Sequence, residues 1–219
     1  MNQTTLDIQD LGITGYGDTL ALQQSLCAKR IADQIPNTIL LTEHKPVITA
    51  GARKTENKLL VSVETIQDRE IDYFTVGRGG GTTAHNPGQI VIYPIVKLKS
   101  VELGLNEFVH TLEQIGIDLL LQYDIHAHTR KDAPGLWIEH RKIGSIGIQA
   151  KHWVTMHGMA INLCNDLSIF NLFVPCGLDG VKMTSAEKET GHRPDMQDVK
   201  DRLGQLCRRT FSRRESEVS

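Results

Sequence analysis

Residues 77–94 read GRGGGTTAHNPGQIVIYP and hold five glycines in eighteen residues. The preceding residues, 71–76, are β-branched and aromatic, which predicts a strand. The following residues, 90–96, form a nearly continuous apolar run, which predicts a buried strand. A glycine-rich loop therefore lies between two strands of a sheet, where binding residues concentrate. Glycines permit positive φ and close approach of a ligand to the backbone, although a plain connection that needs glycine for its turn has the same composition.

The composition is typical of a globular protein that is large enough to fold without disulfides or structural metal ions. The chain has 219 residues, is 40% hydrophobic and 23% charged, and carries a formal charge of −2. This balance excludes a broad basic surface for nucleic acid, and no apolar run is long enough to span a membrane. The four cysteines have no C-x-x-C spacing, which indicates free thiols in a reducing compartment. We therefore expect a cytoplasmic protein.

Outside the glycine-rich loop the chain alternates predicted strands with two clear helices. Apolar residues recur at helical spacing over residues 103–123 and again over 195–214. A third helix is predicted from Asp18 to about Gln34. Further strands are predicted at 5–11, 38–42, 47–50 and 124–130, a short helix at 59–68, and an edge or bend near Pro94.

Residues 136–163 are predicted to form a meander of three antiparallel strands. Its middle strand carries Gly144 and Gly147, and glycine inside a strand often marks close approach of a ligand to the backbone. A bulge is predicted at Gly158, where the apolar phase shifts. Hairpins combined with separate helices predict one α+β domain over residues 1–219, with a mixed, mostly antiparallel sheet, flanking helices and a polar tail from about residue 215.

Cys176 differs from the other three cysteines because it lies between Pro175 and Gly177, outside any apolar stripe. A rigidly held, partly exposed thiol is suited to act as a nucleophile, although a small buried residue in a turn is the plain alternative. By contrast, Cys27 and Cys207 fall on helical stripes and are predicted to be core residues.

A nucleophilic thiol needs a neighbouring cation or base, because a free thiol has a pKa of about 8.5. Lys142 opens the glycine-rich strand of the meander, so its ammonium is one candidate, although an exposed hairpin lysine is the commoner case. His44, His85, His152 and His157 also lie near predicted loops. The pair His126 and His128 is an incomplete metal-ligand set, since no cysteine or carboxylate cluster accompanies it. We therefore predict no metal site.

Six motifs occur in order along the chain: R-G-G-x-x-T-x-H-x-P-G-Q from Arg78, Y-P-I from Tyr93, K-I-x-x-I-G from Lys142, T-x-H-G-x-A-x-N from Thr155, D-L-x-x-F from Asp166 and V-P-C-G-L from Val174. The match around these motifs spans roughly residues 43–185. In this respect the chain closely resembles the octanoyltransferases of lipoate biosynthesis, also called lipoyl(octanoyl) transferases.

The resemblance implies the fold of biotin and lipoate protein ligases and an acyltransferase that needs no cofactor. It implies transfer of an octanoyl group from octanoyl-acyl carrier protein to a lysine of the lipoyl domains of 2-oxoacid dehydrogenases and of the glycine cleavage H protein. Cys176 would form the acyl-thioester, and Lys142 would lower the pKa of that thiol. The implied acyl-binding residues are Arg78, Gly79, Gly80, Gly81, Thr82, Thr83, Ala84, His85, Ser145, Ile146, Gly147, Gly158, Met159 and Ala160.

The loop departs from the family pattern R-G-G-Q-V-T-Y-H-G-P-G-Q, because Gly81-Thr82-Thr83-Ala84-His85-Asn86 replaces Q-V-T-Y-H-G, so that the glutamine and tyrosine side chains are missing. We expect Ala84 to remove an aromatic wall and to alter the preferred acyl-chain length. Arg78 is a candidate to contact the phosphopantetheine or an acidic carrier.

Three alternatives remain at this level: an ATP-dependent lipoate or biotin ligase on the same fold, which would not need Cys176; a non-catalytic module that binds an acyl carrier or lipoyl domain; and a cysteine hydrolase that uses His157.

Overall fold

A computed structural model describes residues 6–131, 133–177 and 180–217, with only the backbone described for residue 176 and for 212–217. The elements in chain order are β1 (Asp7–Thr14), α1 (Tyr16–Ile31), β2 (Thr38–His44), β3 (Val47–Ala50), η1 (Lys54–Glu56), β4 (Lys58–Leu59), α2 (Val63–Gln67), β5 (Asp72–Thr75), β6 (Thr83–His85), β7 (Gln89–Ile95), η2 (Leu98–Val101), α3 (Leu105–Leu121), β8 (Leu136–Ile138), β9 (Arg141–Lys151), β10 (Val154–Asn162), η3 (Leu167–Leu172), β11 (Phe173–Val174), η4 (Pro175–Gly177), β12 (Lys182–Met183), α4 (Ala186–Thr190) and α5 (Met196–Glu217).

A mixed sheet in the order β1-β2-β7-β10-β9-β12 forms the centre of the described chain, with β8 paired to β9. The β1–β2 and β9–β12 pairs are parallel, and the pairs between them are antiparallel. A smaller sheet, β5-β3-β6, and the pair β11-β4 lie toward one end of the molecule. The predicted α+β class and the three-stranded meander are confirmed.

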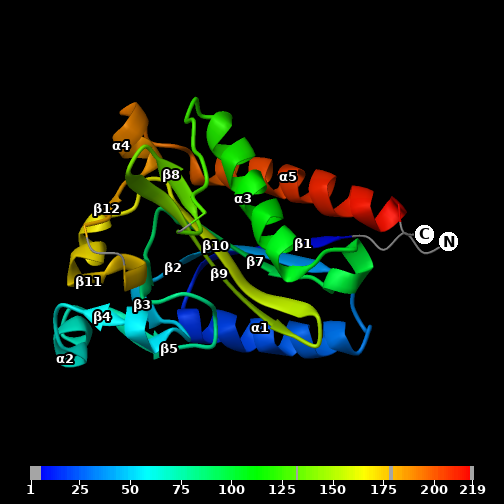
Figure 1. Ribbon diagram of the computed structural model, residues 1–219, viewed down its shortest axis with the longest axis horizontal. Helices are drawn as coiled ribbons and strands as arrows, with labels where there is room; N and C mark the ends of the chain where they lie inside the picture. Colours follow the sequence, from blue (N-terminus) through cyan, green and yellow to red (C-terminus); the bar gives the residue numbers. More distant parts are fainter. Residues whose placement is uncertain (1–5, 132, 178–179, 218–219) are drawn as a thin grey trace.

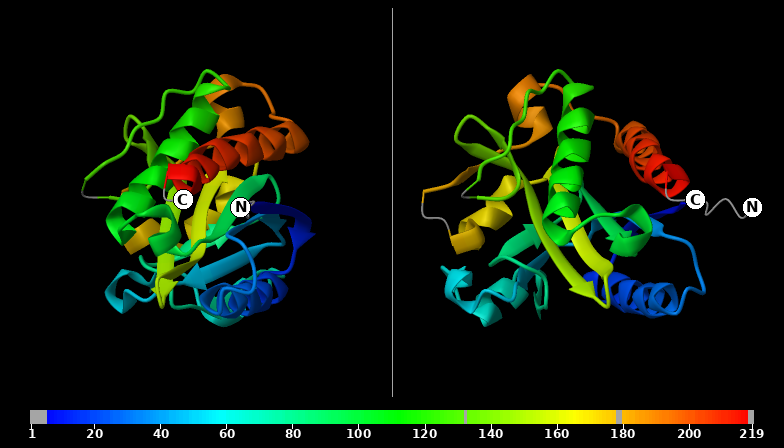
Figure 2. Two further views of the ribbon diagram at one scale, coloured as in Figure 1. Left: turned by 90° about the vertical axis from the view of Figure 1, so that its right-hand side faces the viewer. Right: turned by 45° about the vertical axis from the view of Figure 1, so that its right-hand side comes forward.

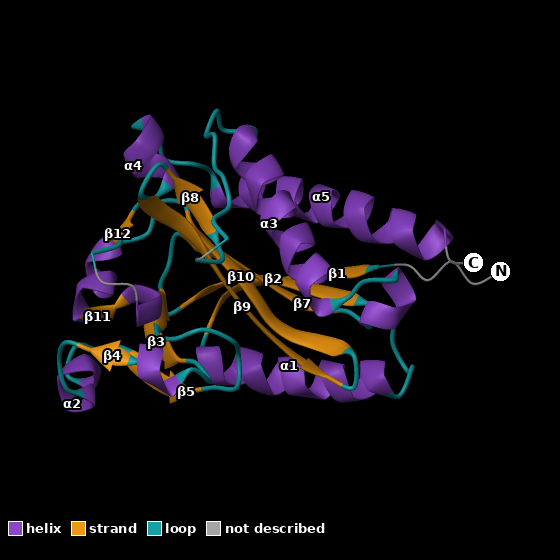
Figure 3. Cartoon of the chain, in the orientation of Figure 1, coloured by secondary structure: helices purple, strands orange, loops and turns teal. Residues whose placement is uncertain are grey.

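The helices cover opposite faces of the central sheet, α1 on one and α3 with α5 on the other (Figures 1 and 2). Figure 3 shows the strands as a layer between these helices. Alternation along the strands decides which residue faces which layer. In β7, Ile90 and Ile92 join the cluster beneath α3 and α5, whereas Val91 and Tyr93 join the cluster beneath α1.

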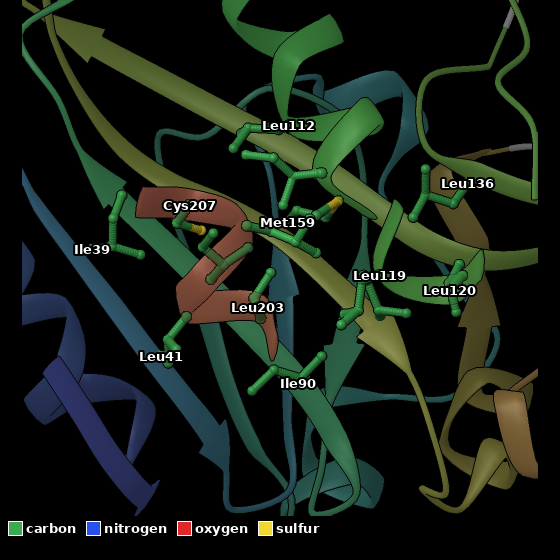
Figure 4. Packing of buried hydrophobic residues seen from close by; sticks show 14 of the residues in the cluster. Ile39, Leu41, Ile90, Leu112, Leu119, Leu120, Leu136, Met159, Leu203 and Cys207 are labelled. Carbon is green, nitrogen blue, oxygen red and sulfur yellow. The ribbon is translucent and has the colours of Figure 1, made fainter. Parts of the chain in front are cut away.

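The cluster beneath α3 and α5 is the principal core (Figure 4). Leu119 of α3 and Leu203 of α5 are fully buried in it against strand residues such as Ile90. Cys207 also lies there with no exposed surface, and Cys27 is buried beneath α1, as predicted for both. Burial raises the pKa of the Cys207 thiol to about 12 and raises those of Cys27 and Cys164, so these thiols are poor nucleophiles at neutral pH.

The position of Pro94 differs from the prediction of an edge. Strand β7 lies inside the sheet, where Pro94 pairs with Ile39 of β2. On its other side, the ladder with β10 runs from Asn162↔Gln89 to Met159↔Ile92 and resumes only at Val154↔Lys97. The sheet therefore accommodates a residue without an N–H by interrupting one ladder opposite it.

The bulge predicted at Gly158 is wrong, because β10 keeps an unbroken register with β9 from Val154↔Lys151 to Ile161↔Gly144. The apolar phase shift instead reflects the interrupted ladder. There His157 adopts a positive φ of 58° and turns its backbone N–H to the Oε1 of Gln23 in α1, at 2.8 Å.

Two further expectations change in the structure. Residues 124–130 form no strand in the described chain beyond a bridge between His128 and Trp137. Helix α5 runs through the first residues of the predicted polar tail, to Glu217.

Among the described residues, no helix combines the length and the apolar character needed to cross a membrane.

Candidate active site

A pocket lies where the glycine-rich loop crosses β9 and β10, and it encloses about 440 Å³ of empty space including its mouth. Ten of the fourteen acyl-binding residues inferred from the sequence line it. The lining consists of Tyr16, Arg78, Gly80, Thr83, His85, Val91, Tyr93, Ser145, Ile146, Gly147, His157, Gly158, Met159 and Ala160.

Gly147 lets the glycine-rich loop cross β9, and Gly158 lets β10 lie close against β7. A Cβ added to Gly147 would lie 2.7 Å from the carbonyl oxygen of Gly79, and one added to Gly158 would lie 1.9 Å from that of Ile92. The N–H of Gly79 in turn donates to the carbonyl oxygen of Ile148 at 3.0 Å. Only glycine at position 147 therefore lets the loop lie directly on β9. The sequence predicted close approach of a ligand at Gly147, and the neighbour found in the structure is the backbone of Gly79.

Arg78 holds the loop in shape from the inside. Its guanidinium donates to the carbonyl oxygen and the Oγ1 of Thr49, both at 2.7 Å, and to the carbonyl oxygens of Gly81 at 2.9 Å and Gly79 at 3.1 Å. The side chain is only 7% exposed. Contact of Arg78 with the phosphopantetheine or an acidic carrier stays a prediction, and in the structure the side chain is bonded to the loop that lines the pocket.

Strand β6 divides its residues between two environments. Thr83 and His85 line the pocket, whereas Ala84 points to the opposite side and is fully buried beside Ile48 and Phe170. The absence of an aromatic ring at Ala84 therefore removes no wall from this pocket, contrary to our expectation. Gly79, Gly81 and Thr82 support the loop without lining the pocket, and Thr82 donates to the Oδ1 of Asn57 at 3.2 Å.

The pocket also contains residues that the sequence did not single out: Tyr16, Val91 and Tyr93. Tyr93 and Val91 face the pocket because they alternate with core residues of β7. The run at residues 90–96 is apolar on both faces, so the sequence did not show which face would line a pocket. Tyr16 lies at the start of α1, 62 residues before Arg78 in the sequence. No local signal connects the two.

Buried aromatic rings form one side of the pocket. Tyr16 stacks on His85 with ring centroids 6.0 Å apart and an angle of 8° between the planes. The Nε2 of His44 lies 2.8 Å from the hydroxyl of Tyr93. Burial lowers the pKa of His44 and of His157 to about 4 and that of His85 to about 3. These three rings are therefore neutral at pH 7.

Lys142 is the second residue of β9, three residues before the pocket residue Ser145, and it is 2% exposed. Its Nζ donates to the carbonyl oxygen of Pro134 at 3.1 Å and lies 5.2 Å from the centre of the Trp137 ring. The indole N–H of Trp137 fixes this segment by donating to the carbonyl oxygen of Ala133 at 2.9 Å. Lys142 is thus held as a buried residue of the sheet and is not an exposed hairpin lysine.

Cys176 lies in η4, and the structure describes only its backbone. Both flanks of η4 are tied to the parts already described. On one side β11 pairs with β4, and on the other β12 pairs with β9 at Met183↔Lys142. Added Cβ atoms at Gly177 and at Gly81 would each come within 3.0 Å of Glu56 in η1. The segment that carries Cys176 therefore meets the glycine-rich loop at Glu56 and the Lys142 strand at β12.

Within the described residues, no cluster of three or more histidines, cysteines or carboxylates is arranged to hold a metal ion.

Comparison with known proteins connects this site to a family. The lipoyl protein ligase A/B catalytic domain matches residues 15–207. An octanoyltransferase of Desulfovibrio desulfuricans is 40% identical over 192 residues, which are 87% of this chain and 81% of that protein.

Two solved structures share the fold at low identity. One is a bipartite lipoate protein ligase from Thermoplasma acidophilum, with a TM-score of 0.70 and 11% identity, covering 94% of this chain and 83% of the other. The second is a biotin protein ligase from Aquifex aeolicus in complex with biotin and ATP, with a TM-score of 0.57 and 14% identity, covering 96% of this chain and 71% of the other.

Proposed function

Because the chain belongs to the lipoyl protein ligase A/B catalytic domain family and its octanoyltransferase relative matches along most of its length, it is an octanoyl-transferring enzyme of protein lipoylation, and we propose that transfer runs through an acyl-thioester on Cys176. The observation that supports this mechanism most directly is the arrangement around η4, which meets the glycine-rich loop at Glu56 and is followed by β12, the strand that pairs with β9 at Lys142.

The proposed reaction has two acyl-transfer steps. The thiolate of Cys176 attacks the octanoyl carbonyl of the carrier thioester, and the carrier thiolate leaves and takes up a proton. The amine of a lipoyl-domain lysine then attacks the new thioester, loses a proton and forms an amide, while the Cys176 thiolate leaves. The first step exchanges one thioester for another, and the second converts a thioester into a more stable amide. Neither step therefore needs ATP.

Lys142 is proposed to favour the thiolate of Cys176. A nearby cation stabilises the charged form of an acid, typically by about 1–3 pKa units when it lies within roughly 4–6 Å. The buried position of the lysine strengthens this effect, because charges interact more strongly in surroundings with a low dielectric constant. The three other thiols have raised pKa values, which supports Cys176 as the nucleophile.

The pocket supports a thin acyl chain as substrate. Glycine backbone, Val91, Ile146 and Ala160 provide narrow apolar walls, and Arg78 keeps the glycine-rich loop in place. We propose octanoyl-acyl carrier protein as donor and a lysine of lipoyl domains as acceptor.

Mass spectrometry after mixing the protein with octanoyl-acyl carrier protein tests the mechanism. We expect one octanoyl adduct on Cys176, its absence in Cys176→Ser, and its disappearance when a lipoyl domain is added. Unchanged transfer by Cys176→Ser, or transfer that requires ATP, would instead indicate a ligase.

The role of Lys142 has its own readout. Replacing Lys142 by Met should raise the apparent pKa of Cys176, measured from the pH dependence of its alkylation, by about 1–3 pH units. Lys182→Met is the matched control, because Lys182 is an exposed lysine on the adjacent strand β12. Identical alkylation profiles for Lys142→Met and the wild type would contradict the role.

A further inference from the structure

Helix α3, which the structure describes in full, has one charged residue at a buried position. Glu113 is 3% exposed, whereas the other buried positions of the helix are apolar or glycine. A carboxylate is costly to bury unless hydrogen bonds compensate it. The Oε1 of Glu113 accepts from the backbone N–H of Gly135 at 3.1 Å, and its Oε2 lies 2.9 Å from the Nδ1 of His110, whose side chain is 77% exposed. One oxygen of this carboxylate therefore holds a buried backbone group 22 residues away in the sequence.

The peptide group between Pro134 and Gly135 connects Glu113 to Lys142. Its N–H donates to Glu113, and its carbonyl oxygen accepts from the Nζ of Lys142 at 3.1 Å. A trans peptide group is planar, and its N–H and C=O point in opposite directions. The carboxylate and the ammonium thus bind opposite sides of one rigid unit, so the bond to Glu113 fixes the direction in which the carbonyl oxygen faces the lysine.

Gly135 also lies against the side chain of Lys142. A Cβ added to Gly135 would lie 2.8 Å from the Cε of Lys142 and would overlap the carbonyl oxygen of Gly144. The φ of Gly135 is 129°, which other residues rarely adopt. The ring of Trp137, whose centre is 5.2 Å from the Nζ, adds a cation–π contact. A displacement of Gly135 would therefore move the backbone against which the lysine is packed.

The position of the ammonium matters because the proposed role of Lys142 is electrostatic. The attraction between a cation and a thiolate decreases as their separation grows, and a lysine side chain is a point charge on a flexible stem. A fixed carbonyl acceptor limits the positions of that charge, and hydrogen bonds in a chain polarise one another. The negative charge of Glu113 therefore makes the oxygen of Pro134 a stronger acceptor for the ammonium.

We propose that Glu113 is a positioning residue for Lys142, which acts through the Pro134–Gly135 peptide group to hold the ammonium where it stabilises the Cys176 thiolate. The inference deepens the proposed function and rests on it, because it concerns the same lysine and the same thiol. A contribution of Glu113 to the stability of the fold alone is the alternative that the experiment must separate.

Glu113→Met tests the proposal, because it removes both oxygens and keeps an unbranched side chain of similar length. The pH dependence of alkylation at Cys176 is followed by mass spectrometry of the modified peptide. The apparent pKa of Cys176 should rise by about 0.5–1 pH unit, a part of the roughly 1–3 units that a nearby cation supplies. Hydrogen exchange of the Gly135 amide should become faster in the same variant, because its buried acceptor is lost.

Two conservative variants bracket the effect. Glu113→Gln keeps an oxygen acceptor for the Gly135 N–H, so it should raise the pKa of Cys176 by less than Glu113→Met. Glu113→Asp keeps the charge but withdraws it by one methylene group, so it should raise the pKa as well. It takes the place of Glu113→Met if that variant does not fold.

Two controls separate positioning from stability. His110→Ala removes the exposed partner of the other carboxylate oxygen, and it should keep the wild-type alkylation profile. Leu119→Ala removes a fully buried side chain from the same helix, so it should destabilise the fold and still keep that profile.

Two outcomes would overturn the proposal. One is a wild-type alkylation profile in folded Glu113→Met, or in Glu113→Asp where it takes its place. The other is a shift in Leu119→Ala as large as that in the Glu113 variants, which would assign to Glu113 a role in stability alone. The proposed function fails by a different result, because an unchanged profile in Lys142→Met removes the role of the lysine itself. A shift in Lys142→Met without one in the Glu113 variants contradicts only the role of Glu113.

Discussion

The two faces of the central sheet are built from the same strands, but one face packs a core and the other lines a pocket. Beneath α3 and α5, residues such as Ile90 and Ile92 close a core of apolar side chains. On the opposite side, the neighbours Val91 and Tyr93 help to line a pocket that also contains glycines and neutral histidines. A one-residue alternation therefore separates a fully packed face from a face that combines a smaller apolar cluster beneath α1 with a pocket.

The difference shows how a cavity is maintained in a sheet protein. Gly147 and Gly158 remove side chains where backbones must approach, and buried polar groups replace the hydrocarbon that would otherwise fill the space. Unfilled space and buried polar groups lower the free energy of unfolding, and the packed core on the other face offsets this loss. Mutations on the two faces should consequently affect different observables.

The largest effect should come from the packed face. Leu119→Ala removes a fully buried side chain next to Leu203 and Ile90, and it should lower the free energy of unfolding by about 2–5 kcal/mol. Urea titration measures this loss. Octanoic acid affinity, measured by calorimetry where the variant is folded, should stay within twofold; a large loss of affinity would contradict the separation of the faces.

On the pocket face, Gly147→Ala should impair function more than stability. The added Cβ would lie 2.7 Å from the carbonyl oxygen of Gly79 and would push the glycine-rich loop off β9. Because a misplacement of about 1 Å can cost about 100-fold in rate, we expect a loss of that size in octanoyl transfer. Transfer within threefold of wild type would show that the loop does not need this contact.

The neutral histidines predict a specific dependence of stability on pH. His44, His85 and His157 have pKa values of about 4, 3 and 4 in the folded protein and about 6.5 when unfolded. Between pH 6.5 and 4 the unfolded state binds more protons, so acidification destabilises the fold by up to about 1.4 kcal/mol per histidine and pH unit.

Replacing His157 by Gln tests this contribution. The slope of unfolding free energy against pH is measured by urea titration between pH 6.5 and 5. The variant should show a smaller slope, which corresponds to about one proton fewer taken up on unfolding. Parallel slopes for the variant and the wild type would mean that His157 is protonated in the folded state.

The smallest effect should again come from the packed face. Gly204 lies in α5, and a Cβ added there would meet only the Cγ2 of Ile8, at 4.0 Å. Gly204→Ala should therefore raise the free energy of unfolding by about 0.4–1 kcal/mol, because it restricts the unfolded chain at a position the helix accepts. Thermal unfolding measures it, and it is also the matched glycine-to-alanine control for Gly147→Ala. Destabilisation would show that the core beneath α5 has no room for a methyl group.

Most elements were predictable because their signals are local. The periodicity of α3 and α5, the hydrophobic runs of β2 and β7 and the hairpins of β8, β9 and β10 all arise from neighbours in sequence. The failures share a cause. The interrupted ladder opposite Pro94 depends on a strand more than 60 residues away, and the expected strand at His126 and His128 lacked a partner longer than one bridge.

For the site, the amino-acid sequence indicated the glycine-rich loop, and the family resemblance of its motifs named ten residues that line the pocket. The roles of Lys142 and Cys176 stay predictions. Tertiary structure alone decided that Tyr16 joins the pocket, that Ala84 faces away from it, and that Arg78 is turned inward to hold the loop. Those outcomes depend on the pairing of strands that are distant in sequence and on the effect of burial on the pKa of a side chain. The residues next to a position in the sequence determine neither the pairing nor the burial.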